Sequence, residues 1–173
     1  FPNTHFYDGE LKAADEVKDH KLESSSKNTS DDLIEKICNF KKGITFVDTQ
    51  GDFNENTPKG STSKENPEEA ELVEKTINRL LDKGINPENM GIISPYDAQI
   101  ELLKKKINVN GLEIKTVDGF QGREKDAIIL SLVRSNDNRD IGFLKDMRRL
   151  NVSLTRARKK LIIIGDGDTL GVD

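Results

Sequence analysis

The sequence has 173 residues, of which 34% are apolar and 34% charged, and a formal net charge of −4 at pH 7. This length suits one domain with a substantial core and is too short for two. No apolar stretch approaches the ~20 residues of a membrane-spanning helix. The single cysteine, Cys38, cannot form an internal disulfide bond, so we expect a reducing compartment. His5 and His20 have no cysteine or carboxylate partners at ligand spacing, so no metal site is expected.

The charge is distributed unevenly along the chain. Residues 1–100 contain 12 Lys and Arg against 20 Asp and Glu, whereas residues 101–173 contain 15 against 11. The first part therefore has a net charge of −8 and the second a net charge of +4. A polyanion such as a nucleic acid is expected to meet the second part.

In the first part of the chain, local patterns predict an irregular segment, a helix, a strand and a loop. Residues 1–32 mix aromatic residues with turn formers. A short helix is expected at residues 32–40, and a strand at 43–49, where β-branched and apolar residues dominate. Residues 51–65 are rich in Gly, Asn, Ser and Thr, which predicts a mobile polar loop.

The next helix has the clearest start and end signals. Asn66 can cap its first turn, Pro67 suits the first helical position, and Glu69 is spaced to complete a capping box. Gly84 is expected to end the helix. The apolar residues that repeat at helical spacing between these signals are Leu72, Val73, Ile77, Leu80 and Leu81.

The rest of the chain alternates short apolar segments with helical patterns. The expected strands are 90–96, 112–118, 126–133 and 159–166, and the expected helices are 97–107 and 146–158. On the last helix, one face is predicted to hold Met147, Leu150, Leu154 and Ala157. Unbroken apolar strands separated by helices are typical of a parallel sheet with both faces covered, so we expect an α/β fold.

Three polar clusters follow predicted strands, at Ser94–Tyr96, Thr116–Gly122 and Arg134–Asn136. Right-handed crossovers place the carboxyl ends of parallel strands at one edge of the sheet, where open α/β sheets bind ligands. We therefore expect the three clusters to form one site at that edge.

Taken singly, the polar residues have ordinary structural explanations. Arg149, Ser153 and Arg156 share one face of the last predicted helix, which could be a solvated basic face or could present a guanidinium to a phosphate. In the segment 116–124, the glycines could form only a tight turn and the charged residues only a surface cluster. The hydroxyl of Thr116 could bind a phosphate or cap the turn.

Taken in order, three segments resemble motifs IV, V and VI of superfamily 1 helicases. They are GIISPYDAQ (91–99), TVDGFQGREKDAIILSLVRSN (116–136) and GFLKDMRRLNVSLTRARKKLIIIGD (142–166). The resemblance is to the branch that contains the nonsense-mediated-decay RNA helicase and the immunoglobulin-mu-binding-protein helicase. It spans nearly the whole chain and is least clear at 12–32 and 51–65.

The resemblance implies a RecA-like α/β fold of the P-loop NTPase type, with a mostly parallel sheet and helices on both faces. The sequence contains no G-x-x-x-x-G-K-[ST] loop and no Asp-Glu strand end for Mg²⁺, which belong to the first RecA-like domain of the family. Residues 1–173 are therefore expected to form the second RecA-like domain alone. The first residue is Phe rather than Met, which also suggests a fragment.

On the nucleotide side, the resemblance implies that Arg156 is an arginine finger reaching the γ-phosphate of ATP. Glu124 matches a carboxylate that meets the nucleotide at its ribose, with Gly122 beside it. Arg149 and Gln121 are further candidates on this side. The ATP, with Mg²⁺, would be held jointly with the first RecA-like domain of the same protein.

On the nucleic-acid side, the resemblance implies contacts with the sugar-phosphate chain of single-stranded RNA or DNA. The matching residues are Ser94, Pro95, Thr116, Val117, Arg134, Ser135 and Asn136. Asp118 and Gln121 would relay between the two sides. Such contacts do not read bases, and they are salt-sensitive. With 5% aromatic residues and no Trp, extensive base stacking is not expected.

The expected function is that of the C-terminal motor domain of an ATP-dependent helicase or translocase. Such a protein would act as a monomer, without a membrane, in the cytoplasm or in a eukaryotic nucleus. By itself the domain is expected to hydrolyse ATP negligibly. The alternative is a RecA-like module that binds nucleic acid or a protein without catalysis, although such a module would have no reason to keep both Glu124 and Arg156.

Overall fold

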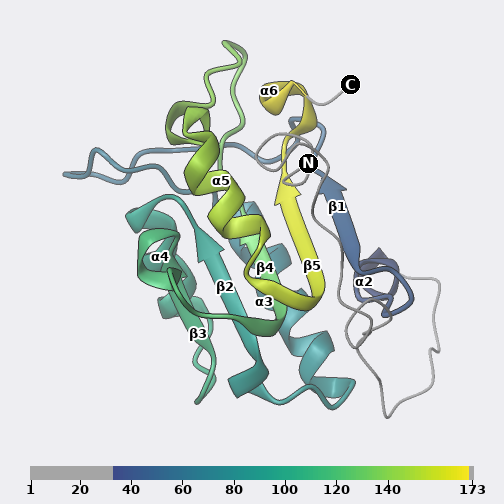
Figure 1. Ribbon diagram of the computed structural model, residues 1–173. Coiled ribbons are helices and arrows are strands. Elements are labelled where there is room, and N and C mark those ends of the chain that lie inside the picture. Colours follow the sequence, from purple (N-terminus) through teal and green to yellow (C-terminus); the bar gives the residue numbers. More distant parts are fainter. Residues whose placement is uncertain (1–32, 172–173) are drawn as a thin grey trace.

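The computed structural model describes residues 33–171, which form a five-stranded, all-parallel sheet with helices on both faces (Figure 1). The strand order is β1-β5-β4-β2-β3. The strands are β1 (Ile44–Asp48), β2 (Met90–Ser94), β3 (Glu113–Thr116), β4 (Lys125–Ser131) and β5 (Ala157–Gly165). This confirms the predicted α/β fold with a parallel sheet. The predicted irregular segment at 1–32 lies outside the described residues.

Helices and turns connect the strands. The α-helices are α2 (Leu33–Ile37), α3 (Pro67–Asp82), α4 (Asp97–Lys106), α5 (Met147–Leu154) and α6 (Gly167–Leu170). The 3-10 turns are η1 (Pro87–Asn89), η2 (Asp118–Phe120) and η3 (Gly142–Lys145). None of the helices in the described part of the chain is long and apolar enough to cross a membrane.

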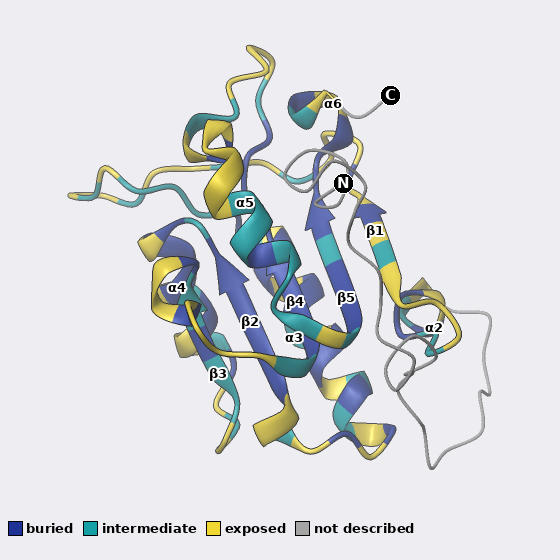
Figure 2. Cartoon of the chain, in the orientation of Figure 1, coloured by how far each residue is buried: buried dark blue, intermediate teal, exposed yellow. Residues whose placement is uncertain are grey.

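Alternate residues of the central strands point into two separate hydrophobic layers. On one face, Ile92 and Ile129 pack with the apolar residues of α2, α3 and α4. On the other face, Ile128 and Leu130 pack with η2, η3 and α5. In Figure 1, α5 lies in front of β4 and α3 lies behind the sheet. Every residue of β2 is buried, whereas the edge strand β1 is largely exposed (Figure 2).

The start of α3 is capped as predicted, but Glu69 has a different partner. The Asn66 side chain accepts a hydrogen bond from the Glu69 N–H at 3.0 Å. The Glu69 carboxylate does not return to the Asn66 N–H, which donates instead to Gln99 Oε1 at 2.9 Å. Glu69 accepts hydrogen bonds from the Ser131 hydroxyl at 2.6 Å and from the Val133 N–H at 3.1 Å. The predicted capping box is therefore wrong, because the tertiary structure offers its carboxylate stronger partners.

The last predicted helix is shorter than expected. α5 ends at Leu154, and Ala157 already begins β5, so the predicted helix 146–158 is wrong in its final turn. Strand pairing determines where the helix ends, since Ala157 is in register with Lys125 of β4. Ser153 faces inward and is buried, so it does not share an exposed face with Arg149 as predicted. Its hydroxyl donates to the Arg149 carbonyl at 3.0 Å.

The polar loop 51–65 is tied to the domain at several points. Asn56 and Glu65 form an antiparallel bridge that closes the outer part of the loop. Ser63 accepts a hydrogen bond from the Ala98 N–H, at the start of α4, at 3.1 Å. Mobility of the loop stays a prediction.

Candidate functional site

The predicted site residues lie at two opposite edges of the sheet. Ser94 and Thr116 are in register at the carboxyl ends of β2 and β3. Glu124 immediately precedes β4, and Arg156 immediately precedes β5, so both lie at the amino edge. The three predicted clusters do begin at one edge, because each follows the carboxyl end of a strand, β2, β3 or β4. Gly122, the last residue of the second cluster, lies instead with Glu124 and Arg156 toward the amino edge. Two parallel strands that follow one another in the chain need a connection that returns along the sheet, and residues 117–124 make that return from β3 to β4.

At the amino edge, the Arg156 guanidinium is held by three neutral acceptors. Its Nε donates to the Val152 carbonyl at 2.9 Å, Nη1 to the Arg123 carbonyl at 3.4 Å, and Nη2 to Thr155 Oγ1 at 3.0 Å. Within residues 33–171, Arg156 forms no ion pair with a carboxylate. The side chain is half-buried and oriented, and its positive charge is not neutralised by these partners.

Glu124 and Gly122 lie beside this arginine in the turn that enters β4. The backbone of Lys125 donates to the Arg156 carbonyl at 3.0 Å, which joins the two segments. Glu124 is exposed and pairs with Arg158 at 3.2 Å. Gly122 has a φ of 74°, and a Cβ there would meet no atom within 4 Å. The backbone conformation therefore requires glycine here, and the space beside Gly122 is open.

The remaining nucleotide-side candidates are not gathered around Arg156. Arg149 Nη2 forms an ion pair with Asp118 Oδ2 at 3.1 Å, which links α5 to η2. Arg149 also lines a small cavity with Pro95 and Val117, which belong to the other edge. Gln121 is exposed in the returning segment. The structure thus brings together Gly122, Glu124 and Arg156, and places Arg149 toward the predicted nucleic-acid side.

At the carboxyl ends of β2 and β3, two of the four predicted strand-contacting residues are buried. The Ser94 side chain is fully buried, and its hydroxyl accepts a hydrogen bond from the Tyr96 N–H at 3.5 Å. Val117 is also buried, whereas Pro95 is half-buried. Thr116 is half-buried, and its hydroxyl accepts a long, exposed hydrogen bond from the Gly119 N–H at 3.3 Å. Thr116 is therefore the one residue of these four that presents a side-chain hydroxyl at the surface.

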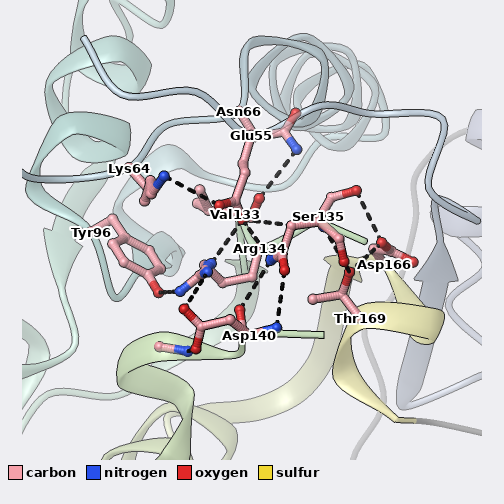
Figure 3. Close-up of polar contacts among 12 residues, drawn as sticks. Glu55, Lys64, Asn66, Tyr96, Val133, Arg134, Ser135, Asp140, Asp166 and Thr169 are labelled. Atoms are coloured by element: carbon pink, nitrogen blue, oxygen red, sulfur yellow. Dashed lines mark hydrogen bonds and ion pairs between the residues drawn. The ribbon is translucent and has the colours of Figure 1, made fainter. Parts of the chain in front are cut away.

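Arg134 is the centre of a polar network beyond the end of β4 (Figure 3). Its Nε donates to Glu55 Oε2 at 2.8 Å, Nη2 to Asp140 Oδ2 at 3.1 Å, and Nη1 to the Tyr96 hydroxyl at 3.4 Å. Burial alone would lower the pKa of Arg134, but these hydrogen bonds raise it overall. For Glu55, burial alone would raise the pKa, and the hydrogen bond from Arg134 lowers it overall. Arg134 therefore stays charged within the protein and is satisfied by it.

Ser135 and Asn136 are also engaged inside the domain. The Ser135 hydroxyl donates to Asp166 Oδ2 at 2.9 Å, and the Asn136 N–H donates to Thr169 Oγ1 at 2.9 Å. These bonds attach the segment after β4 to the segment after β5 (Figure 3). The structure thus places Arg134–Asn136 at the predicted edge, with their side chains turned to protein partners.

Comparison with known proteins identifies the family. DNA polymerase alpha-associated DNA helicase A of Schizosaccharomyces pombe is 38% identical over 98% of this chain and 26% of its own length. Putative regulator of nonsense transcripts 1 of Takifugu rubripes is 40% identical over 98% of this chain and 15% of its own length. DNA-binding protein SMUBP-2 of Rattus norvegicus is 38% identical over 95% of this chain and 16% of its own length. The AAA domain family model matches residues 1–168.

The chain belongs to the superfamily 1 helicase family. This confirms the family resemblance and, with the five-stranded parallel sheet, the RecA-like fold. The helicase domain described here spans about a quarter, or less, of the length of these relatives.

The helicase domain contains a strained peptide that the sequence patterns did not indicate. Val133 has a φ of 72°, which is rare for a β-branched residue. Its N–H donates to Glu69 and its carbonyl accepts from Asn66 Nδ2 at 3.3 Å. Burial raises the pKa of Glu69 to about 7. The two side chains at the start of α3 therefore fix the peptide that leads directly into Arg134.

Glu55 and Tyr96 are further residues of the helicase domain that sequence reasoning missed as parts of this edge. Glu55 lies in a polar loop whose composition is typical of solvent-exposed segments, so no local signal separates it from its neighbours. Tyr96 was included in the Ser94–Tyr96 cluster, but its buried contact with Arg134 could not be read from spacing. Both contacts join segments that are far apart in the chain.

Proposed function

We propose that this chain is the second motor domain of an ATP-dependent helicase or translocase. In this proposal the amino edge of the sheet meets the nucleotide and the carboxyl edge meets a single nucleic-acid strand. The observation that carries it is the Arg156 guanidinium, oriented by three neutral acceptors beside Glu124 and left without a carboxylate partner in the described residues. A structural arginine is normally paired, as Arg134 is in the same domain.

At the amino edge, Arg156 would stabilise the charge that develops on the γ-phosphate during hydrolysis. An arginine in this role is worth about 10³–10⁵ in rate. Glu124 would accept a hydrogen bond from the ribose, which requires it to leave its exposed pair with Arg158. Gly122 would allow close approach through the open space beside it, with Gln121 nearby.

The other half of the nucleotide site would come from a first RecA-like domain. The 173 residues contain no phosphate-binding G-x-x-x-x-G-K-[ST] loop, so ATP and Mg²⁺ would be held jointly by the two domains. By itself this domain would hydrolyse ATP negligibly. The complete protein would act as a monomer, in the cytoplasm or in a nucleus.

At the carboxyl edge, the strand would be held through its sugar-phosphate chain. The Thr116 hydroxyl would donate to a phosphate, and the backbone at Pro95 and Val117 would line the path. Ser94 and the Arg134–Asn136 segment would support this surface, since their side chains are occupied by protein partners. Binding of this kind does not depend on base sequence and weakens as salt rises.

Both RNA and DNA are compatible with these contacts. The relatives include proteins named as a DNA helicase and as a regulator of nonsense transcripts. The phosphate contacts proposed here would serve either polymer.

The test is Arg156→Ala in the full-length protein, with Arg148→Ala as the matched control. Arg148 is an exposed arginine of α5 outside the proposed site. We expect Arg156→Ala to lower kcat for strand-stimulated ATP hydrolysis by about 10³-fold or more while strand binding persists. Arg148→Ala should keep near wild-type hydrolysis. Near wild-type hydrolysis by Arg156→Ala would overturn the assignment, and wild-type binding without any hydrolysis would favour a binding module.

A further inference from the structure

Phe143 in η3 is the most exposed aromatic residue of the described chain. Its side chain is 60% exposed, whereas the next most exposed aromatic, Phe46 on the edge strand β1, is 38% exposed. The adjacent Leu144 is buried in the core, so the turn is anchored directly next to the exposed ring. Exposure of Phe143 is therefore a property of an ordered turn rather than of a loose end.

The position of Phe143 is at the proposed strand-binding edge. Its ring centroid lies 5.8 Å from that of the buried Tyr96, with an angle of 56° between the planes. Phe143 also lines a small cavity together with Pro95, Val117 and Arg149. Two of these residues, Pro95 and Val117, are proposed strand contacts.

The turn that carries Phe143 is fixed by the Arg134 network. Asp140 accepts a hydrogen bond from the Gly142 N–H at 3.0 Å while its other oxygen accepts from Arg134 at 3.1 Å. Gly142 has a φ of 52°, and a Cβ there would collide with the Arg134 guanidinium and the Tyr96 hydroxyl. The ring is thus presented by a turn with little freedom, which reduces the entropy lost when it binds a partner.

We propose that Phe143 stacks on a base of the bound single strand. The inference rests on the proposed function, because it needs a strand whose backbone passes Pro95, Thr116 and Val117. An aromatic ring accepts any base, so this contact adds affinity without sequence preference. It also adds one stacking position to a surface whose other proposed contacts are with phosphates. Residues 101–173, which contain Phe143, have the positive net charge that suits a polyanion.

The test measures Kd for the full-length protein on two single strands of equal length. One is an oligonucleotide with bases, and the other has abasic residues at all internal positions. The variants are Phe143→Ala, Phe143→Leu and Phe143→Trp, with Phe46→Ala as the matched control for loss of an exposed aromatic ring. Melting temperatures establish that each variant is folded.

Stacking predicts a distinct pattern. Phe143→Ala should raise Kd about 5- to 150-fold on the strand with bases and leave Kd on the abasic strand unchanged. Phe143→Trp should bind the strand with bases as tightly as wild type or more tightly. Phe143→Leu, which keeps apolar packing, should recover only part of the loss. Phe46→Ala should match wild type on both strands.

Two results would overturn this inference and leave the proposed function intact. An equal loss for Phe143→Ala on both strands would mean that the ring only supports Tyr96 and Arg134. Wild-type Kd for Phe143→Ala on the strand with bases would mean that no base stacks on the ring. A wild-type protein that binds neither strand would instead overturn the proposed function, and the inference would fail with it.

Discussion

Glu55 Oε2 and Arg134 Nε lie 2.8 Å apart, although the two residues are separated by 79 positions in the chain. Both side chains are nearly buried, at 9% and 7% exposure. Glu55 belongs to the long polar loop, and Arg134 to the segment after β4. The pair therefore attaches the loop to the carboxyl edge of the sheet (Figure 3). Arg134 also binds Asp140, which holds the turn that carries Phe143.

Removal of the Glu55 side chain should destabilise the domain more than removal of a carboxylate from an exposed ion pair. We expect Glu55→Ala to lower the free energy of unfolding by about 3 kcal/mol, because Arg134 is left buried with only Asp140 and Tyr96. The control is Glu71→Ala, which breaks a largely exposed pair with Lys106 and should cost less than about 1 kcal/mol. Denaturant unfolding of both variants is the measurement, and equal losses would contradict the role given to Glu55.

Glu69 should make the domain less stable as pH rises, whereas most paired carboxylates have the opposite effect. Burial raises its folded pKa to about 7 from 4.5. The protonated carboxyl is therefore favoured by the fold, so its stabilisation is fully present below pH 4.5 and is lost as pH rises through about 7. Relative to Glu69→Gln, wild type should lose about 3 kcal/mol of unfolding free energy over that range. Asp166 adds to the effect, since its charge also raises the pKa of Glu69.

The measurement is the difference in unfolding free energy between wild type and Glu69→Gln at several pH values from 4.5 to 8. Subtraction removes the contribution of the other titrating groups. Glu68→Gln, at an exposed glutamate of the same helix, is the control. A difference for Glu69→Gln that stays constant with pH would show that the carboxylate is charged in the fold throughout.

Substitutions at Thr116 and Ser94 should have different effects, the first on strand binding and the second on stability. Thr116→Val removes the surface hydroxyl, and we expect about 5- to 10-fold weaker binding of a single strand with little change in melting temperature. Ser94→Ala removes a fully buried hydroxyl and should cost about 1 kcal/mol of stability while Kd stays near wild type. Strand titrations at two salt concentrations and thermal melts measure both. The reverse pattern would place the strand contact at Ser94.

Much of the fold could be predicted because buried strands and helix ends have recognisable local sequence patterns. The apolar runs of β2, β4 and β5 fill both faces of a parallel sheet, and the caps of α3 are local features. The end of α5 was mispredicted because the residues after Leu154 still fit a helical pattern. Their pairing with β4 is a non-local interaction that outweighs this preference.

The candidate site was predictable in its residues more than in its geometry. Motif order singled out Arg156 and Thr116 as candidates, but not that they lie at opposite edges, because the course of residues 117–124 depends on where β4 must begin. The Glu55–Arg134 pair, the Glu69–Val133 contact and the exposure of Phe143 all depend on the folded structure. Spacing along the chain contains no information about such contacts.

The separation of the two edges limits how a motor built on this domain could work. β4 has seven residues at about 3.3 Å each, so the proposed nucleotide and strand surfaces lie roughly 20 Å apart. No side chain of Arg156 or Glu124 reaches the other surface. The buried centre of the sheet is close-packed and deforms little, so it would move as a stiff plate. Under the proposed assignment, a small rotation of the sheet, caused by phosphate binding at the amino edge, would displace the carboxyl edge along the nucleic-acid strand. The displacement would be proportional to the length of β4, which separates the two edges.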